Sequence, residues 1–310
     1  MHERYLGIEI GGTKLQLVAG DAQGGILGRR RLTVDPARGG AGIREQIAAT
    51  LPELVAEFQP RAIGVGFGGP VDGATGQICC SHQVAGWTDF PLGEWLRSRA
   101  GLPVAVDNDA NTAALGEAHR GAGVGCDPVF YVTLGSGVGG GLVVDGRIYH
   151  GAKPGEAELG HVRLDRSGAT VESRCSGWAV DAKIRAAALL EPRSVLAQLT
   201  ADADRGQARA LAPALRGHCP VAEAILRETA GDLAFALSHV VHLFHPQVIV
   251  LGGGLSLVGE PLRAAVTEAL GAFIMEAFAP GPQIRLAGLD EDSVPVGALL
   301  LARTAKEPQK

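Results

Sequence analysis

Residues 8–14 read Ile-Glu-Ile-Gly-Gly-Thr-Lys, and residues 132–139 read Val-Thr-Leu-Gly-Ser-Gly-Val-Gly. In each stretch an apolar run breaks into a turn of small residues, and a second apolar run comes after it. Overlaying Gly11 on Gly135 aligns the two stretches as an internal repeat. Glycine-rich turns expose backbone N–H groups that can bind phosphate. The repeat therefore predicts a nucleotide-dependent enzyme in which two such turns hold a polyphosphate.

Composition is consistent with a folded chain of two ordinary domains. The 310 residues are 46% hydrophobic and 20% charged, which is typical of globular proteins rather than disordered ones. A net charge of −5 argues against a nucleic-acid partner. The start of the chain does not resemble a signal peptide, and no apolar run reaches the ~18–20 residues of a membrane span. We therefore expect a cytoplasmic protein without membrane partners.

Alternating apolar and amphipathic segments predict an α/β protein. Strands are expected at residues 5–10, 15–19, 26–32, 62–67, 104–106 and 247–251, a second meander at 129–149, and helices at 42–58, 92–99, 110–120, 180–190, 194–216, 222–244, 260–278 and 295–303. We place an N-terminal domain at residues 1–122 and a C-terminal domain at residues 123–294. The helix at about 295–305 is expected to pack back on the first domain.

Six motifs in order resemble the ROK family of sugar kinases and sugar-responsive repressors, over nearly the whole chain. They lie at residues 7–14, 68–72, 107–117, 134–141, 158–161 and 250–255. The resemblance implies the two-domain actin-like ATPase (ribonuclease H-like) fold. Each half of that fold is a mixed sheet with flanking helices, and a cleft lies between the halves.

Asp109 is the candidate catalytic residue. Its position between a strand end and a helix start favours a helix N-cap. The family resemblance instead implies a general base, which accepts the proton of a sugar hydroxyl as the phosphoryl group arrives. Asn108 would then bind a neighbouring hydroxyl, and Gly69 would belong to the same sugar site.

A second sugar-binding group is expected at Glu158, His161 and Glu172. A glutamate and a histidine three residues apart can point at one small polar ligand. The resemblance implies that Glu158 and His161 bind sugar hydroxyls, and that Glu172 lies in the next loop. The alternatives are a turn histidine bonded to backbone for His161 and a solvated loop charge for Glu172.

The nucleotide contacts are expected to come mainly from backbone. They comprise Gly11, Gly12, Thr13 and Lys14 in the first turn, Gly135, Ser136 and Gly137 in the second, and Gly253 and Gly254 near the adenosine. The alternative for each glycine is a tight turn or close helix packing, which is compatible with binding. Glu9 stands where most relatives carry Asp, and could hold Mg²⁺ through water.

Two departures from the family concern the sugar side. Many relatives bind a structural zinc through a cysteine-rich segment after the Gly-His pair, but residues 162–172 contain no cysteine. We therefore predict that the zinc site is absent, although that loop normally positions the residue equivalent to Glu172. Gln83 stands where relatives usually have Asn.

The leading function is an ATP- and Mg²⁺-dependent hexose kinase that forms a homodimer. The alternatives are a sugar-binding regulator without a DNA-binding domain, and a non-catalytic binding protein. Family repressors carry a helix-turn-helix segment before the first hairpin, and only four residues precede Tyr5 here. The sequence does not name the hexose.

Overall fold

The computed structural model describes residues 3–81, 84–153, 155 and 157–306. Gln83 lies outside these residues. Contacts divide the chain into two compact units. Unit 1 comprises residues 1–125, 141–157 and 291–310, and unit 2 comprises residues 126–140 and 158–290.

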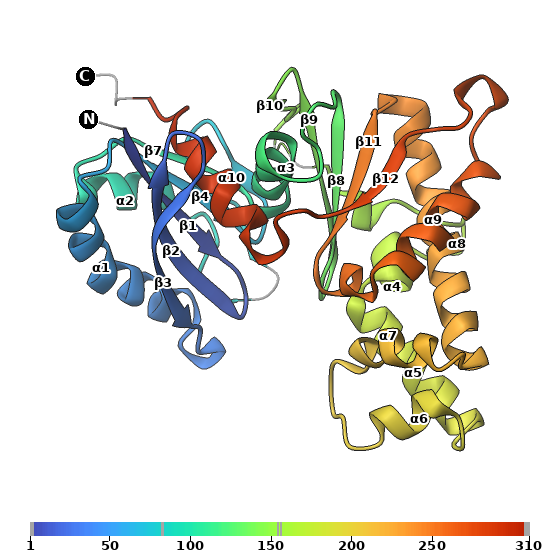
Figure 1. Ribbon diagram of the computed structural model, residues 1–310. Coiled ribbons are helices and arrows are strands. Elements are labelled where there is room, and N and C mark those ends of the chain that lie inside the picture. Colours follow the sequence, from blue (N-terminus) through green and yellow to red (C-terminus); the bar gives the residue numbers. More distant parts are fainter. Residues whose placement is uncertain (1–2, 82–83, 154, 156, 307–310) are drawn as a thin grey trace. The chain divides into compact units, whose positions relative to one another are not determined.

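The first sheet contains five strands in the order β3-β2-β1-β4-β7 (Figure 1). These are β1 (Arg4–Ile10), β2 (Lys14–Asp21), β3 (Ile26–Thr33), β4 (Ile63–Phe67) and β7 (Val104–Asn108). Strands β1, β2 and β3 form the predicted antiparallel meander, β4 pairs in parallel with β1, and β7 pairs in parallel with β4. A small hairpin of β5 (Val71–Asp72) and β6 (Gln77–Ile78) comes after β4.

Helices cover both faces of the first sheet. Unit 1 holds α1 (Gly39–Phe58), α2 (Leu92–Ala100), α3 (Asp109–Arg120) and α10 (Ser293–Ala302). Successive side chains of a strand point to opposite faces. On β1, Leu6, Ile8 and Ile10 therefore enter a buried core with residues of α1 and α2. Gly7 points to the other face, where an added Cβ would lie 3.2 Å from the Cβ of Ala298 in α10.

Glycines let α10 approach β4 and α3 at backbone distance. A Cβ added at Gly64 of β4 would lie 1.9 Å from the carbonyl oxygen of Ala298. A Cβ added at Gly297 would lie 1.7 Å from the carbonyl oxygen of Thr112 in α3. Any side chain at these positions would push the elements apart. Figure 1 shows α10 beside α3. Helix α3 also contacts β4 directly, since a Cβ added at Gly66 would lie 3.2 Å from the Thr112 side chain.

The second sheet repeats the strand order of the first, as β10-β9-β8-β11-β12. Its strands are β8 (Val129–Leu134), β9 (Val138–Val144), β10 (Arg147–Ile148), β11 (Val248–Gly252) and β12 (Gln283–Leu286). Strand β11 pairs in parallel with both β8 and β12. The internal repeat read from the two glycine-rich stretches therefore extends to the whole sheet, and the α/β fold class is confirmed.

The remaining helices lie in unit 2. They are α4 (Val171–Cys175), α5 (Gly177–Leu190), α6 (Val195–Thr200), α7 (Leu211–Arg216), α8 (Pro220–Phe244) and α9 (Glu260–Gly271). Short 3₁₀ helices span Pro36–Arg38, Leu159–His161, Gln207–Ala210, Gly254–Val258, Glu276–Phe278 and Asp290–Asp292. Within the described part of the chain, no helix is both long enough and apolar enough to cross a membrane.

Two predicted helices were too long. Residues 194–216 form α6, a 3₁₀ turn and α7 instead of one helix, because Gly206 adopts a φ of +76° that interrupts the helical backbone. Residues 260–278 form a helix only as far as Gly271. Helix α4, strand β12 and the β5–β6 hairpin were not predicted, and all of them are short.

The close approach of α10 to α3 predicts that Gly297→Ala destabilises the protein. The added methyl group overlaps the Thr112 carbonyl, so we expect a loss of about 1–3 kcal/mol in the free energy of unfolding. The matched control is Gly231→Ala in α8, where an added Cβ meets no atom within 4 Å. That variant should gain up to about 1 kcal/mol, because alanine favours helix over glycine. Urea denaturation measures both, and equal effects would contradict this account of the packing.

Candidate active site

Three parallel strands of unit 1 end at the same level. Strand register pairs Ile10 with Phe67 and Phe67 with Asn108, so the chain leaves β1, β4 and β7 side by side. A Cβ added at Gly68 would lie 3.4 Å from Asp109 Oδ2 and 3.7 Å from the Cα of Gly11. Ligands of α/β proteins bind beyond the carboxyl ends of such strands. The first glycine-rich turn and Asp109 therefore share one edge of the sheet.

Asn108, and not Asp109, is the N-cap of α3. The Oδ1 atom of Asn108 accepts hydrogen bonds from the N–H groups of Ala110 at 2.8 Å and Asn111 at 3.2 Å. Its Nδ2 group donates to the Gly69 carbonyl oxygen at 3.2 Å. Asp109 is the first helical residue, is half-buried, and accepts from the Ala110 N–H through Oδ1 at 2.9 Å. Asn108 therefore caps α3, and the helix does not depend on Asp109 for its N-cap.

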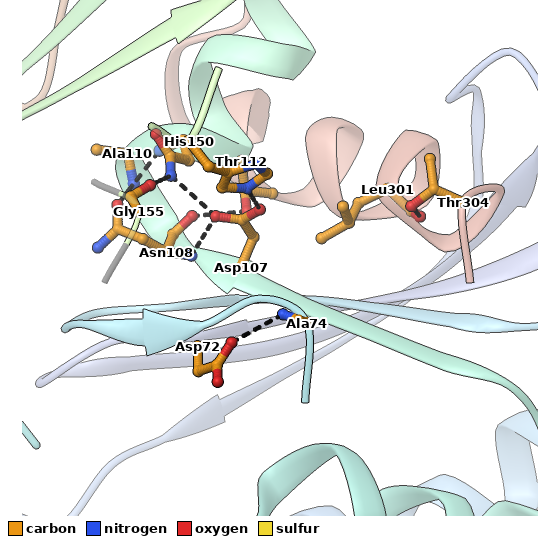
Figure 2. A network of polar contacts seen from close by, with 11 residues as sticks. Asp72, Ala74, Asp107, Asn108, Ala110, Thr112, His150, Gly155, Leu301 and Thr304 are labelled. Carbon is orange, nitrogen blue, oxygen red and sulfur yellow. Dashed lines mark hydrogen bonds and ion pairs between the residues drawn. The ribbon is translucent and has the colours of Figure 1, made fainter. Parts of the chain in front are cut away.

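Asp107, which precedes this cap, lies in a buried polar network (Figure 2). Its Oδ1 atom accepts from the Asn108 N–H at 2.8 Å and from Asn111 Nδ2 at 2.9 Å. Its Oδ2 atom lies 2.6 Å from Nε2 of His150. His150 and Asn111 were not predicted as part of the site. The His150–Asp107 and Asn111–Gly155 contacts join residues 43 and 44 positions apart in the sequence.

The first glycine-rich turn covers Gly11, Gly12 and Thr13, between β1 and β2. The Gly11 N–H donates to the Lys14 carbonyl oxygen at 2.8 Å and closes the turn. The Lys14 ammonium lies 3.7 Å from a carboxylate oxygen of Glu9 and 3.8 Å from one of Glu291. The turn thus carries a cation held between two carboxylates.

Glu9 lies beside this turn on β1, opposite Gln16 of β2. Burial raises the pKa of the Glu9 carboxyl group. A hydrogen bond from Gln16 Nε2 and the charge of Lys14 both act to lower that pKa, but burial outweighs them.

The second glycine-rich turn covers Gly135, Ser136 and Gly137, between β8 and β9. The Gly135 N–H donates to the Gly137 carbonyl oxygen at 2.9 Å, and the Gly177 N–H donates to the Gly135 carbonyl oxygen at 2.7 Å. The N-terminus of α5 is therefore bonded directly to this turn.

Glu172 extends from α4 over the second turn. Its Oε2 atom accepts from the Val138 N–H at 3.0 Å, and a Cβ added at Gly137 would lie 2.5 Å from that oxygen. Glu172 is thus an exposed residue of a short helix rather than of a loop, and its carboxylate contacts the turn.

Gly253 lies against the end of β8. It has a φ of +81°, and an added Cβ would lie 2.7 Å from backbone atoms of Leu134. Gly254 begins the adjoining 3₁₀ helix. In unit 2 the ends of the parallel strands β8 and β11 therefore bring this glycine pair next to the second turn.

Glu158 and His161 lie on a short 3₁₀ segment of unit 2. His161 Nε2 is 3.9 Å from Glu158 Oε2, and the side chains are 72% and 48% exposed for His161 and Glu158. The 3₁₀ geometry places residues three apart on one side. Both side chains are therefore exposed on the same side of this segment.

Zinc ligation was expected to be absent here. Among the described residues, no group of three or more His, Cys, Asp and Glu side chains is arranged to hold a metal ion. Cys175 is buried in α4, where its thiol lies 3.7 Å from the Thr229 carbonyl oxygen. Burial raises the pKa of this thiol to about 12, which disfavours the thiolate that zinc requires.

Comparison with known proteins gives consistent matches along nearly the full chain. A sequence model described as the ROK family matches residues 5–305. A glucokinase from Halalkalibacterium halodurans is 31% identical over 94% of this chain and 93% of its own length. A glucokinase from Thermotoga maritima is 30% identical, over 95% and 96% respectively. A ROK family glucokinase from Streptomyces griseus, solved in complex with glucose and AMPPNP, has a TM-score of 0.84 and 32% identity. That match covers 97% of this chain and 100% of the other.

The raised pKa of Glu9 predicts how stability depends on pH. The folded chain keeps this proton at pH values where the unfolded chain has lost it, so the free energy of unfolding falls as pH rises through that interval. Glu9→Gln removes this loss. We therefore expect the stability of the variant relative to the unsubstituted protein to increase as the pH rises above the ordinary glutamate pKa of about 4.3.

Chemical denaturation at a series of pH values measures the difference. Glu268→Gln, at an exposed position of α9, serves as the control for loss of a carboxylate charge. The quantity compared is the free energy of unfolding of Glu9→Gln minus that of the unsubstituted protein. If this difference stays constant or shrinks as the pH rises, the burial of an ionisable group at this position is contradicted.

Proposed function

The chain belongs to the ROK family, and from this we propose that it is an ATP-dependent sugar kinase acting on a hexose hydroxyl. Two glucokinases of similar length and a glucokinase structure with glucose and AMPPNP support this function. The observation that carries it in this chain is the convergence of Asp109, Gly68 and the Gly11 turn at one sheet edge.

Asp109 is proposed as the general base. The hexose hydroxyl oxygen forms a bond to the γ-phosphorus, the bond from that phosphorus to the β,γ-bridging oxygen breaks, and ADP leaves. The hydroxyl proton passes to the Asp109 carboxylate. The fixed first turn of α3 supports this role, because it holds the carboxylate at a defined point of the sheet edge.

The sugar is proposed to contact Gly69, Asn108, Glu158, His161 and Glu172 in addition to Asp109. An amide nitrogen carries two N–H donors, so Asn108 can hold Gly69 and also donate to a sugar oxygen. The exposed carboxylate and imidazole of Glu158 and His161 supply an acceptor and a second polar group. Glu172 already bonds the Val138 N–H, so it would join the sugar and phosphate sides of unit 2.

The phosphates of ATP are proposed to bind backbone N–H groups of the two glycine-rich turns, with Lys14 as an added positive charge. These groups are Gly11, Gly12 and Thr13 in one turn and Gly135, Ser136 and Gly137 in the other. Gly253 and Gly254 would face the adenosine. Nucleotide phosphates carry the negative charge that such turns and Lys14 attract.

Magnesium would enter with the nucleotide and neutralise charge on the transferred phosphoryl group. Mg²⁺ commonly uses only one or two carboxylates besides phosphates and water. Glu9 would supply one such carboxylate, because its side chain lies beside the first turn, with an oxygen 3.7 Å from the Lys14 ammonium.

We further propose a cytoplasmic homodimer that binds neither nucleic acid nor membrane. The net charge of −5 supports the absence of a nucleic-acid partner. The two domains are proposed at residues 1–122 and 123–294, with the C-terminal helix joining the first.

Asp109→Asn is expected to lower kcat by about 100- to 10,000-fold, because the amide cannot accept the hydroxyl proton. The measurement is a coupled assay of ADP release with Mg·ATP across a panel of hexoses. Asp202→Asn, an exposed carboxylate of unit 2, is the control and should retain full activity. An Asp109→Asn variant with near-normal kcat would exclude this carboxylate as the base.

Glu158→Gln and His161→Leu are expected to raise the KM for the hexose by about 10- to 100-fold, because each removes a polar contact to a sugar hydroxyl. The KM for ATP should stay within about twofold, since neither residue is proposed to contact the nucleotide. Steady-state kinetics with each substrate varied separately tests this. A rise confined to the KM for ATP would contradict the assignment.

A further inference from the structure

His150 and Gly155 each contact the junction between β7 and α3 (Figure 2). His150 Nε2 lies 2.6 Å from Asp107 Oδ2, and Asn111 Nδ2 donates to the Gly155 carbonyl oxygen at 2.9 Å. Asp107 is only 3% exposed and Asn111 is fully buried. These are long-range contacts between buried groups and a connecting segment, so they restrain where that segment lies.

The same carboxylate organises the first turn of α3. Through Oδ1, Asp107 accepts from the Asn108 N–H and from Asn111 Nδ2. Asn108 in turn caps the helix whose first residue is Asp109. A buried carboxylate needs donors on both oxygens, and a histidine donor forms a strong, charge-assisted bond. His150 is therefore part of the shell that fixes the Asp109 turn.

The orientation of the Asn111 amide is set by the two oxygens to which its Nδ2 group donates. Among the described residues, Asn111 Oδ1 has no hydrogen-bond partner, although it is buried. Reversing the amide would turn this oxygen toward the two oxygens that Nδ2 now serves, on Asp107 and Gly155. The Asn111 Nδ2 group therefore makes both bonds of this bridge, and Oδ1 cannot replace it in either.

We propose that His150 is a positioning residue for phosphoryl transfer. Acting through Asp107, it holds the N-terminal turn of α3, and with it Asp109, in the orientation that proton transfer requires. This inference rests on the proposed kinase function and extends it to a residue that contacts neither substrate.

A set of variants at His150 separates positioning from simple packing. His150→Phe keeps a ring but removes the donor, and should lower kcat by about 10- to 100-fold while the KM for ATP stays within about twofold. His150→Gln can place an amide nitrogen near the Nε2 position and should recover most of the lost kcat. Should the phenylalanine variant fail to fold, His150→Asn, which is too short to reach Asp107, gives the same comparison with Gln.

Lys153→Ala is the matched control within the same segment. Lys153 pairs with Asp72 at 2.8 Å, but its side chain is 63% exposed. Exposed ion pairs contribute little. We expect this variant to keep the kcat of the unsubstituted protein. A loss of kcat at His150 would then reflect the contact with Asp107 rather than the loss of any contact made by a neighbouring residue.

Hydrogen exchange of the protein without substrates supplies a readout independent of activity. His150→Phe should speed exchange of the Ala110 and Asn111 amides, and His150→Gln should restore their protection. Faster exchange with unchanged kcat would reduce the contact to a structural one and overturn the proposal.

Two further outcomes overturn it while leaving the kinase function intact. One is an equal loss of kcat in folded Phe and Gln variants, and the other is full activity in both. If the unsubstituted protein phosphorylates no hexose, the proposed function fails first and this inference falls with it.

Discussion

The in-register parallel pairing of β1, β4 and β7 is the constraint on which the candidate site depends. Because Ile10, Phe67 and Asn108 lie at one level, the chain emerges from three strands at neighbouring points. The segments after these strands, namely a glycine-rich turn, a glycine pair and a helix start, are thereby brought together. A shift of one residue in β7 would move Asp109 along the edge and turn alternate side chains to the opposite face. Glycines at positions 64 and 297 support this arrangement by letting α10 lie directly on β4 and α3.

The two repeated turns share a strand order but are stabilised by different chemistry. The first carries Lys14 between the carboxylates of Glu9 and Glu291, so its surroundings are ionic and half-exposed. The second is bonded to the start of α5 through Gly177 and to the Glu172 carboxylate through Val138. The repeat thus keeps the backbone geometry, while the side chains around each turn differ.

Local patterns in the sequence were sufficient to predict most of the fold. The apolar runs around Gly11 and Gly135 predicted both meanders, and the family motifs correctly selected the fold class. The prediction of one helix over residues 194–216 failed at Gly206. Most residues there favour a helix, but the positive φ of Gly206 interrupts the helical backbone. Prediction was also off by one residue at the start of α3, because Asn108 and Asp109 are both good N-cap types. The His150–Asp107 contact could not be predicted, since nothing in either local sequence marks the other as its partner.

Phosphorus NMR of the reaction products tests the central claim most directly. The protein is incubated with Mg·ATP and each hexose in turn, and the spectrum identifies where the γ-phosphoryl group has gone. We predict a new phosphomonoester resonance that depends on the hexose and grows as ATP is consumed. Release of inorganic phosphate alone, or unchanged ATP with every hexose, would contradict the proposed kinase function.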